Sequence, residues 1–599
     1  MSALDFGIVI VYIIAMVIIG LVMQKRASEG IDSYFLGGRK IPWWVLGSSG
    51  MASNLDISGT MINTAFIFAL GACGFFIEIR GGVTLIMAFL MIFQGKWNRR
   101  AEVMTLAEWM HFRFGKERQG DVARLIAAIS ILITTIAMIT YFAVGSGKFV
   151  AEFLHIPGFW GLEPQFWAAT LMIVLAMIYT VASGLYGVVW TDVFQGVLIF
   201  GTIIYVCVLA AGYVIPETFS VSMPLRDGGF MAVETTRDAW TSMIPNWNLN
   251  LDEASAYSIY NLFGIAILFY LLKVTLEGSG GTSQYMIQRF FAARSDREAG
   301  LLSLLWTILL GFRWPFIMAI AILGISLGNI QDPEAVLPRV INELVPIGAK
   351  GLLVAGLMAA GMSTFDSTVN AGAAYWVKDI YQAYINPKAT GRQLMIHSRI
   401  SSLIIVIIGL GCTLFIRNIN EIWGWITSSL GAGLLIPTLA RWYWWRMNGY
   451  GFAAGTVAGM VAAILQRIFL PDIPEYYAFS IATLSSLVGL VIGTFASQPT
   501  DIKVLNEFYK RTRPFGFWKP VRESISQTVM SKINAENRRD IISTFMAVPW
   551  QVVLFLTGMA LMTQRWDQFG WLSLILVALS TGLYFKWYRH LSTEVEVNN

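Results

Sequence analysis

The chain has 599 residues, of which 56% are hydrophobic and only 13% are charged. Soluble globular proteins carry about 25% charged residues, so this composition excludes that class and predicts a polytopic membrane protein. The net charge of +5 comes from basic residues dispersed between apolar segments, which indicates loop bias rather than a nucleic-acid surface.

Cysteine and histidine usage argues against an enzyme. The three cysteines lie inside apolar runs, so they form neither a disulfide framework nor a metal-ligand spacing. The four histidines are scattered in or beside expected loops. The sequence therefore shows no His/Cys metal centre and no Ser-His-Asp pattern, and it indicates no obligate protein partner.

Apolar segments of membrane length fill most of the chain. Counting about 20 apolar residues per crossing predicts about fifteen spans. They fall near 5–24, 43–73, 81–97, 122–154, 164–185, 187–215, 258–284, 298–328, 349–381, 398–417, 420–445, 450–470, 476–496, 546–563 and 569–587. Because no basic region precedes the first and no small-residue cleavage site follows it, we expect a retained helix rather than a signal peptide.

Lysine and arginine in the loops predict the orientation. Residues 95–124 carry seven basic side chains, whereas 217–257 carry only Arg226 and Arg237 against six acids. The first loop is therefore expected in the cytoplasm and the second outside. This places the N-terminus outside and the C-terminus inside the plasma (bacterial inner) membrane. The basic segment 501–539 then falls inside, as an interfacial, partly helical linker or as a solvated loop.

Two spans are interrupted by small and polar residues. Span two contains Gly47–Gly50 and then Ala52–Gly59, and span seven contains Gly278–Ser283. Each would open a five-helix unit, and paired interruptions of this kind predict an inverted-repeat transporter with a binding site at the membrane midplane. Unwound backbone there frees carbonyl oxygens for a cation. The alternative is closely packed glycine helices.

The stretch 351–384 is a membrane-length helix that carries oxygen-bearing side chains on one face, at steps of three and four residues. The face comprises Ala360, Ser363, Thr364, Asp366 and Ser367. A carboxylate near the bilayer centre costs roughly 2.5–3.5 kcal/mol, so Asp366 should face a partner, a cavity or an ion. Hydroxyl and carboxylate oxygens suit Na⁺. Alternatively, the hydroxyls bond their own helix carbonyls as small packing residues.

Further charges lie within the expected spans. Lys273 and Glu277 are spaced i, i+4, which favours a self-satisfied ion pair. Arg313 has no sequence neighbour to neutralise it. A guanidinium facing a cavity suits a carboxylate, so these residues favour an anionic or zwitterionic solute.

Seven motifs in order resemble the sodium:solute symporter family, which includes sodium/glucose, sodium/proline and sodium/sialic acid transporters. They are SYFLGGRKIPWW at 33–44, ASN at 52–54, VMTLAEW at 103–109, ASGLYGVVWTDVFQG at 182–196, SQYMIQRFFAARSDREA at 283–299, AAGMST at 359–364 and YWWRMN at 443–448. The resemblance implies an all-α, leucine-transporter-like (LeuT-like) fold. Ten core helices would form two inverted five-helix repeats, with one extra helix before them and about four after.

The implied domains follow this plan. They are an N-terminal helix at 1–30, the first repeat at 42–216, an external loop at 217–257, the second repeat at 258–446, two further helices at 447–497, a cytoplasmic basic linker at 498–545, and two C-terminal helices with a tail at 546–599.

The resemblance also implies two sodium sites. The main site, Na2, would use backbone carbonyls of the first core helix and groups of the eighth: Ala52, Leu55, Ala360, Ser363 and Thr364. A second site, Na3, present in some members, would use Asp192, Ser363, Asp366 and Ser367. The family usually has Ser or Thr where Asp366 stands. Either Na3 is more anionic here, or Asp366 is protonated or paired with a basic residue and the site does not bind Na⁺.

The substrate positions match the family less well. Asn54 falls on a sugar-contacting position, Ser279 on an aromatic gate position, and Gly424, between two tryptophans, on a sugar-binding glutamine. The usual seventh-helix lysine is missing, with Arg313 one residue away. The candidate substrate residues are Asn54, Asp56, Lys273, Glu277, Ser279, Arg313, Trp423 and Trp425.

The expected function is sodium-coupled symport of a small polar organic solute, anionic or zwitterionic, by alternating access. The expected partners are the solute, sodium ions and the lipid bilayer. Three alternatives stay open: a sodium/sugar symporter, a proton-coupled carrier that uses Asp366, and a membrane solute sensor. The sensor is disfavoured because no soluble segment is longer than the linker.

Overall fold

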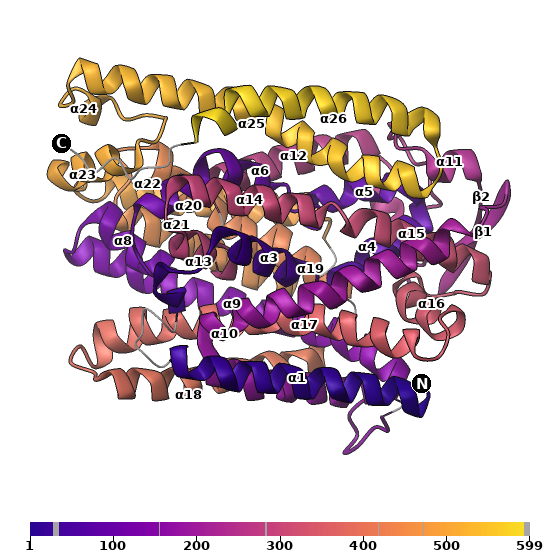
Figure 1. Cartoon of the computed structure of the whole chain (residues 1–599). Helices are drawn as coiled ribbons and strands as arrows, with labels where there is room; N and C mark the ends of the chain where they lie inside the picture. The colour runs from indigo at the N-terminus through magenta and orange to yellow at the C-terminus, as the bar shows by residue number, and fades with distance from the viewer. Residues whose placement is uncertain (28–34, 155, 282–283, 417–418, 471–472, 592–599) are drawn as a thin grey trace.

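A computed structural model describes residues 1–27, 35–154, 156–281, 284–416, 419–470 and 473–591. Its helices lie side by side along one direction. The hairpin β1–β2 lies at one end, and helices α8, α23 and α24 lie at the other (Figure 1). Within the described residues, twelve helices are long and apolar enough to cross a membrane.

The remaining predicted spans also fall on helical segments. Two shorter apolar helices cover Ala3–Ile19 and Pro164–Ile178. The span predicted at 81–97 coincides with a helical run broken by a π turn: α6 (Ile86–Phe89), the turn Leu90–Gln94 and α7 (Gly95–Arg100). The chain is therefore mostly helical, as expected, and the exact number of crossings stays a prediction.

The elements before the hairpin include both halves of the first interrupted span. They are α1 (Ala3–Ala27), α3 (Trp43–Asn54), α4 (Ile57–Leu70), α5 (Gly74–Ile77), α6, α7, α8 (Leu106–Phe114), α9 (Arg118–Leu154) and α10 (Pro164–Ala211). α10 contains both the apolar stretch Pro164–Ile178 and the membrane-length stretch Gly187–Ala211.

The elements after the hairpin include both halves of the second interrupted span. They are α12 (Phe263–Gly280), α13 (Gln284–Ala292), α14 (Asp296–Leu310), α15 (Arg313–Leu327), α16 (Val336–Leu344), α17 (Ala349–Ala374), a π-helical continuation Tyr375–Ile385, α18 (Gly391–Cys412), α19 (Ile419–Trp425), a π turn Ile426–Leu430 and α20 (Gly431–Tyr443).

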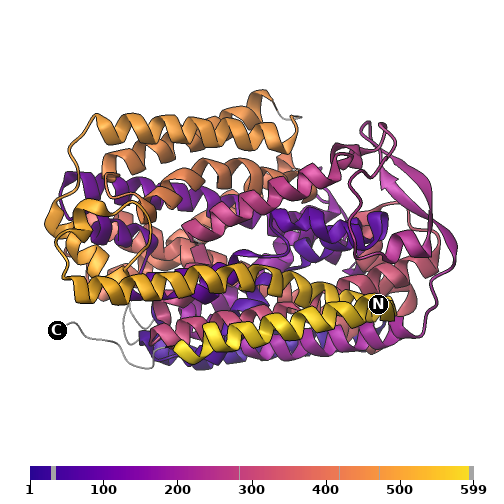
Figure 2. The same cartoon turned by 90° about the horizontal axis from the view of Figure 1, so that it is seen from above.

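The C-terminal elements form two helix pairs joined by a partly helical segment. They are α21 (Gly449–Phe469), α22 (Glu475–Phe495), α23 (Ile502–Thr512), α24 (Lys519–Arg522), α25 (Gln527–Met562) and α26 (Trp566–Lys586). The pair α21–α22 packs against α20, and the pair α25–α26 contacts α15 and α6 through α25. The two pairs lie at opposite edges of the molecule (Figure 2).

The segment between α10 and α12 carries a hairpin that the sequence did not predict. β1 (Thr218–Pro224) and β2 (Phe230–Thr236) pair antiparallel, with Val221 opposite Val233, and the short α11 (Arg237–Thr241) follows. Along β1, Val221 and Met223 are buried while the intervening Ser222 is partly exposed. The alternation packs one face of the hairpin on the helices.

α17 lies at the centre of the molecule. Every residue from Leu353 to Ala374 is buried, whereas only three residues of α26 are. A central helix must place its polar side chains against other protein groups. The oxygen-bearing face of α17 must therefore contact the helices around it.

Candidate functional site

The first helix interruption lies where the sequence predicted it. α3 ends at Asn54, Leu55 has non-helical dihedral angles, and Asp56 caps α4 by accepting a 3.0 Å hydrogen bond from the Gly59 N–H. An aspartate at this position satisfies a donor at the helix N-terminus. At the break the Leu55 N–H donates a hydrogen bond to the Ala52 carbonyl, with an N–O distance of 3.3 Å.

The second interruption also coincides with the glycine run. α12 ends at Gly280, Gly281 has φ of +87°, and α13 begins at Gln284. A positive φ is readily adopted only by glycine, which explains why the helix stops there. Thr282 and Ser283, also part of the predicted interruption, lie outside the described residues.

The broken helix α3 contacts the hydroxyl face of α17. Ser53 Oγ lies 3.3 Å from Ser363 Oγ and 2.9 Å from Ser367 Oγ. Thr364 Oγ1 donates to the Ala360 carbonyl at 3.1 Å, which is the helix-internal bond that the packing alternative predicted. Thr364 also lines a small chamber of about 50 Å³ together with Ser53, Asn54 and Asp56.

The groups named for Na2 therefore lie on two elements that pack together. Carbonyl and hydroxyl oxygens are hard donors, so the residues present on α3 and α17 fit a sodium ion in chemistry. The set of residues named for Na2 stays a prediction.

Asp192, on α10, anchors a buried polar cluster. Its carboxylate accepts hydrogen bonds from Ser49 Oγ and Ser363 Oγ, each at 2.5 Å. The guanidinium of Arg289, on α13, lies 3.3 Å from the same carboxylate. Asp366 is fully buried and interacts electrostatically with Arg289. The residues named for Na3 are thus near one another, but an arginine lies among them.

Sequence reasoning did not name Arg289 as a site residue. It lies within the quoted motif SQYMIQRFFAARSDREA, soon after the second interruption. A charged side chain in a membrane-embedded segment is by default a functional candidate, and that signal was present in the sequence.

The charged substrate candidates form two separate ion pairs. Arg313 Nη2 lies 3.5 Å from Asp56 Oδ1, and Arg313 Nη1 donates to the Asn54 carbonyl at 3.1 Å. Lys273 Nζ lies 3.0 Å from Glu277 Oε1, as the i, i+4 spacing predicted. Arg313 therefore has an acidic partner that its sequence neighbours did not reveal.

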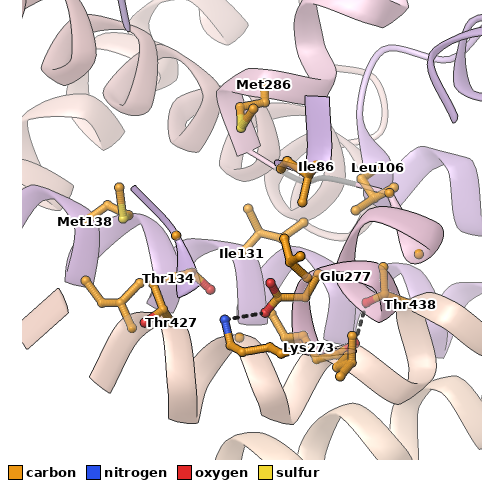
Figure 3. A pocket seen from close by; sticks show the side chains of 18 of the residues that line it. Ile86, Leu106, Ile131, Thr134, Met138, Lys273, Glu277, Met286, Thr427 and Thr438 are labelled. Carbon is orange, nitrogen blue, oxygen red and sulfur yellow. Dashed lines mark hydrogen bonds and ion pairs between the residues drawn. The ribbon is translucent and has the colours of Figure 1, made fainter. Parts of the chain in front are cut away.

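The Lys273–Glu277 pair faces a cavity of about 280 Å³ (Figure 3). Most of the lining surface is apolar, including Ile86, Ile131 and Met286, and the charged side chains of Arg80 and Arg441 line it as well as the ion pair. Asn54, Tyr285, Trp423 and Thr427 also line it. The Asn54 amide donates to the Tyr285 hydroxyl at 2.9 Å.

Four of the substrate candidates lie outside the lining of this cavity. Asp56 and Arg313 line the small chamber instead, and Trp425 and Ser279 make other contacts. The Trp425 indole N–H donates to the Ala463 carbonyl of α21 at 3.2 Å. Ser279 contributes its carbonyl, which accepts a hydrogen bond from the Tyr443 hydroxyl at 2.8 Å. Each residue of a helix turns by about 100°, so Trp423 and Trp425, two residues apart, point about 200° apart and have different surroundings.

A polar network lines the cavity beside α5, which lies toward the hairpin (Figure 1). The fully buried Arg80 guanidinium contacts Glu78 at 3.1 Å and also pairs with Glu475 of α22. Trp423 covers Gly81 and stacks on Tyr141 with ring centroids 4.9 Å apart. In the opposite direction the lining continues to Leu106 of α8, so the cavity extends toward the end that carries α8, α23 and α24.

Clusters able to hold a transition metal are not found: in the part of the chain that the structure describes, no three His, Cys, Asp or Glu side chains gather as a metal-binding group.

Comparison with known proteins gives consistent matches. The family model described as Sodium:solute symporter family matches residues 34–459. A sodium/glucose cotransporter of Vibrio parahaemolyticus is 26% identical over 533 residues, covering 84% of this chain and 91% of that protein. A sodium/sialic acid symporter of Proteus mirabilis is 24% identical over 518 residues, covering 81% and 94%.

A solved structure shares the fold. It is a Na⁺-coupled sialic acid symporter in a substrate-bound, outward-open state, with a TM-score of 0.62 and 19% identity, covering 84% of this chain and 99% of that one. The likeness establishes the LeuT-like architecture.

Proposed function

The chain belongs to the sodium:solute symporter family, and from this membership and the shape of the cavity we propose that its solute is a small zwitterion or anion. The protein is a sodium-coupled symporter, and Na⁺ is its coupling ion. Its relatives are transporters rather than enzymes. Sodium and an organic solute are accordingly its partners.

The single observation that carries the solute class is the Lys273–Glu277 pair facing the cavity. The buried Lys273 ammonium also donates to the Arg80 carbonyl at 2.9 Å. An ammonium and a carboxylate side by side in the lining complement a solute that carries both charges, and a lone carboxylate would engage Lys273 alone. The cavity volume of about 280 Å³ lies just under the usual range of about 300–1,000 Å³ for ligand pockets. It therefore favours a small solute with an apolar portion.

The proposed sodium site is Na2, formed by the carbonyl oxygens of Ala52, Leu55 and Ala360 and the hydroxyls of Ser363 and Thr364. A sodium ion there would join the break between α3 and α4 to α17. Asn54 lies at that break and lines the solute cavity, so ordering the break would also order part of the cavity wall. Sodium and solute would then each bind more tightly in the presence of the other, with a reciprocal coupling of typically ~1–3 kcal/mol.

The proposed orientation places the N-terminus outside and the C-terminus in the cytoplasm of the bacterial inner membrane. The bacterial relatives and the basic residues at 95–124 support it. Under this orientation the cavity, which extends toward α8, corresponds to an inward-facing state. A membrane potential then adds an inward driving force of about 2.3 kcal/mol per charge for each 100 mV.

A sodium/sugar symporter is the second candidate. Relatives named as sodium/glucose cotransporters support it, as do the amide of Asn54 and the ring of Trp423 in the cavity lining, since sugars bind through hydrogen bonds and aromatic faces.

Uptake into proteoliposomes under an imposed sodium gradient tests the proposal. A panel of labelled amino acids, carboxylates and sugars is compared for the wild type, Lys273→Met and Glu277→Gln. We expect zwitterion or carboxylate uptake that falls at least about tenfold in Lys273→Met, equivalent to ~1.4 kcal/mol. Arg339→Met is the matched control, because Arg339 and Glu343 form an i, i+4 pair at the same 3.0 Å distance on the exposed part of α16. Uptake confined to sugars, unchanged in both cavity variants, would reject the proposed solute class.

A further inference from the structure

The buried cluster around Asp192 already contains a cation that belongs to the chain. We call it the Asp192 cluster; it comprises Ser49, Ser53, Asp192, Arg289, Ser363 and Ser367, all of them fully buried. The members come from α3, α10, α13 and α17, so the cluster ties both interrupted helices to the central helix.

The guanidinium of Arg289 lies at the centre of these oxygens. Its Nη2 atom is 2.7 Å from Ser49 Oγ, 2.7 Å from Ser53 Oγ and 2.9 Å from Ser367 Oγ. It is also 3.3 Å from Asp192 Oδ2. A guanidinium is effectively always charged and has five N–H donors. Of the residues named for Na3, Asp192 and Ser367 are therefore in direct contact with a fixed positive charge.

A sodium ion added to this cluster would lie within a few ångströms of the guanidinium. Like charges at such a distance repel strongly in a membrane interior, where screening is weak. The cation would also have to displace hydrogen bonds from oxygens that have no access to water. The residues named for Na3 therefore do not fit a sodium ion while Arg289 occupies this position.

The charge balance of the interior leads to the same result. When ionised, Asp192 and Asp366 carry two negative charges and Arg289 carries one positive charge, which leaves one negative charge. A sodium ion in the neighbouring Na2 site, which shares Ser363, would neutralise it. A second sodium ion would leave an excess positive charge at a depth where uncompensated charge is costly.

We infer that Arg289 acts as a tethered replacement for a second sodium ion, so that the protein binds and transports one sodium ion per cycle. The inference rests on the proposed Na2 site for that one ion. It does not depend on the solute class, because sodium binding can be measured without solute.

The test is equilibrium binding of radioactive sodium to the purified full-length protein, without solute. We expect about one sodium ion per wild-type chain, with a Hill coefficient near 1. Thr364→Ala should lose that ion at the same sodium concentration. Asp192→Asn should retain about one ion, bound more weakly. Arg289→Gln, which removes the charge but keeps an amide donor, should raise the stoichiometry toward about two.

Each outcome of the binding measurement either supports or overturns the inference. Two ions per wild-type chain, or one ion that Asp192→Asn abolishes and Thr364→Ala retains, would overturn the inference while leaving the symporter assignment intact. No measurable sodium binding would overturn the Na2 site of the proposed function together with the inference built on it. The wild-type stoichiometry by itself distinguishes one bound sodium ion from two. The inference can therefore be tested even if Arg289→Gln does not fold.

Discussion

Arg313 and Asp56 form a buried ion pair across the first helix break: Nη2 of Arg313 is 3.5 Å from Oδ1 of Asp56, and the same guanidinium donates to the Asn54 carbonyl. The arginine thus holds both the capping residue of α4 and the last residue of α3. Its two contacts fix the geometry of the unwound segment from α15, a helix more than 250 residues later in the chain.

Arg313→Met is expected to lower the melting temperature markedly. Removing one partner of a buried pair leaves an uncompensated charge and typically costs about 3–5 kcal/mol. Asp56→Asn/Arg313→Met should recover part of the loss, because neither charge then remains. Intrinsic-fluorescence melting of the purified protein measures both. Arg339→Met, at an exposed pair, should stay near wild type, and an equal loss there would refute the stated cause.

Thr364→Ala is expected to raise the sodium concentration for half-maximal uptake by about tenfold, or ~1.4 kcal/mol. The substitution removes a hydroxyl proposed as a sodium donor. Thr368→Ala is the control one turn away, since its hydroxyl donates to the Thr364 carbonyl at 2.8 Å and it is not a proposed donor. Sodium-titrated uptake compares them. Wild-type sodium dependence in Thr364→Ala would disprove the Na2 assignment.

Glu475→Gln is expected to open the cavity toward the hairpin end. The change weakens the ion pair between α22 and the buried Arg80, so the closed state loses stability. Labelling of Thr427→Cys by a membrane-impermeant thiol reagent, added from the hairpin side, should accelerate about fivefold, corresponding to ~1 kcal/mol. Glu421→Gln, at a more exposed pair with Arg467, serves as the control. Equal labelling in both backgrounds would show that Arg80 and Glu475 do not form a gate.

Glu536→Gln is expected to loosen α25 from the core. Glu536 lies 2.8 Å from both Lys96 and Arg100 of α7. Hydrogen bonds between charged groups contribute about 1.5–3 kcal/mol each. Limited proteolysis between α24 and α25 should therefore become faster in the variant. Glu507→Gln, whose partner Arg511 is 3.9 Å away in an exposed pair, should be cleaved like the wild type. Unchanged cleavage in Glu536→Gln would mean that other contacts hold α25.

The ion pairs between α25 and α7 also explain why the start of α25 was predicted too late in the sequence. The last spans were expected to begin at 546, but α25 begins at Gln527. Its first turns are too polar for a hydropathy count to include, and they are helical because Glu536 and Asp540 reach the basic side chains of α7. The partly helical character expected of the linker is present in α23 and α24.

The sequence alone determined the class of protein and both helix breaks, because these depend on local chemistry, and its ordered motifs identified the family. Apolar length specifies a membrane helix, and glycine and capping aspartate act on the backbone within a few residues. The Lys273–Glu277 ion pair was likewise predicted from the sequence, because residues spaced i, i+4 are neighbours on a helix surface.

Only the tertiary structure decided how distant charges are paired. Arg289 reaches Asp192 from 97 residues away, Arg313 reaches Asp56, and Glu475 reaches Arg80 across 395 residues. It also separated Trp423, which lines the cavity, from Trp425 and Ser279, which do not. The physical reason is that a buried charge must be neutralised, but which opposite charge does so depends on how the helices pack, and that information is spread over the whole chain.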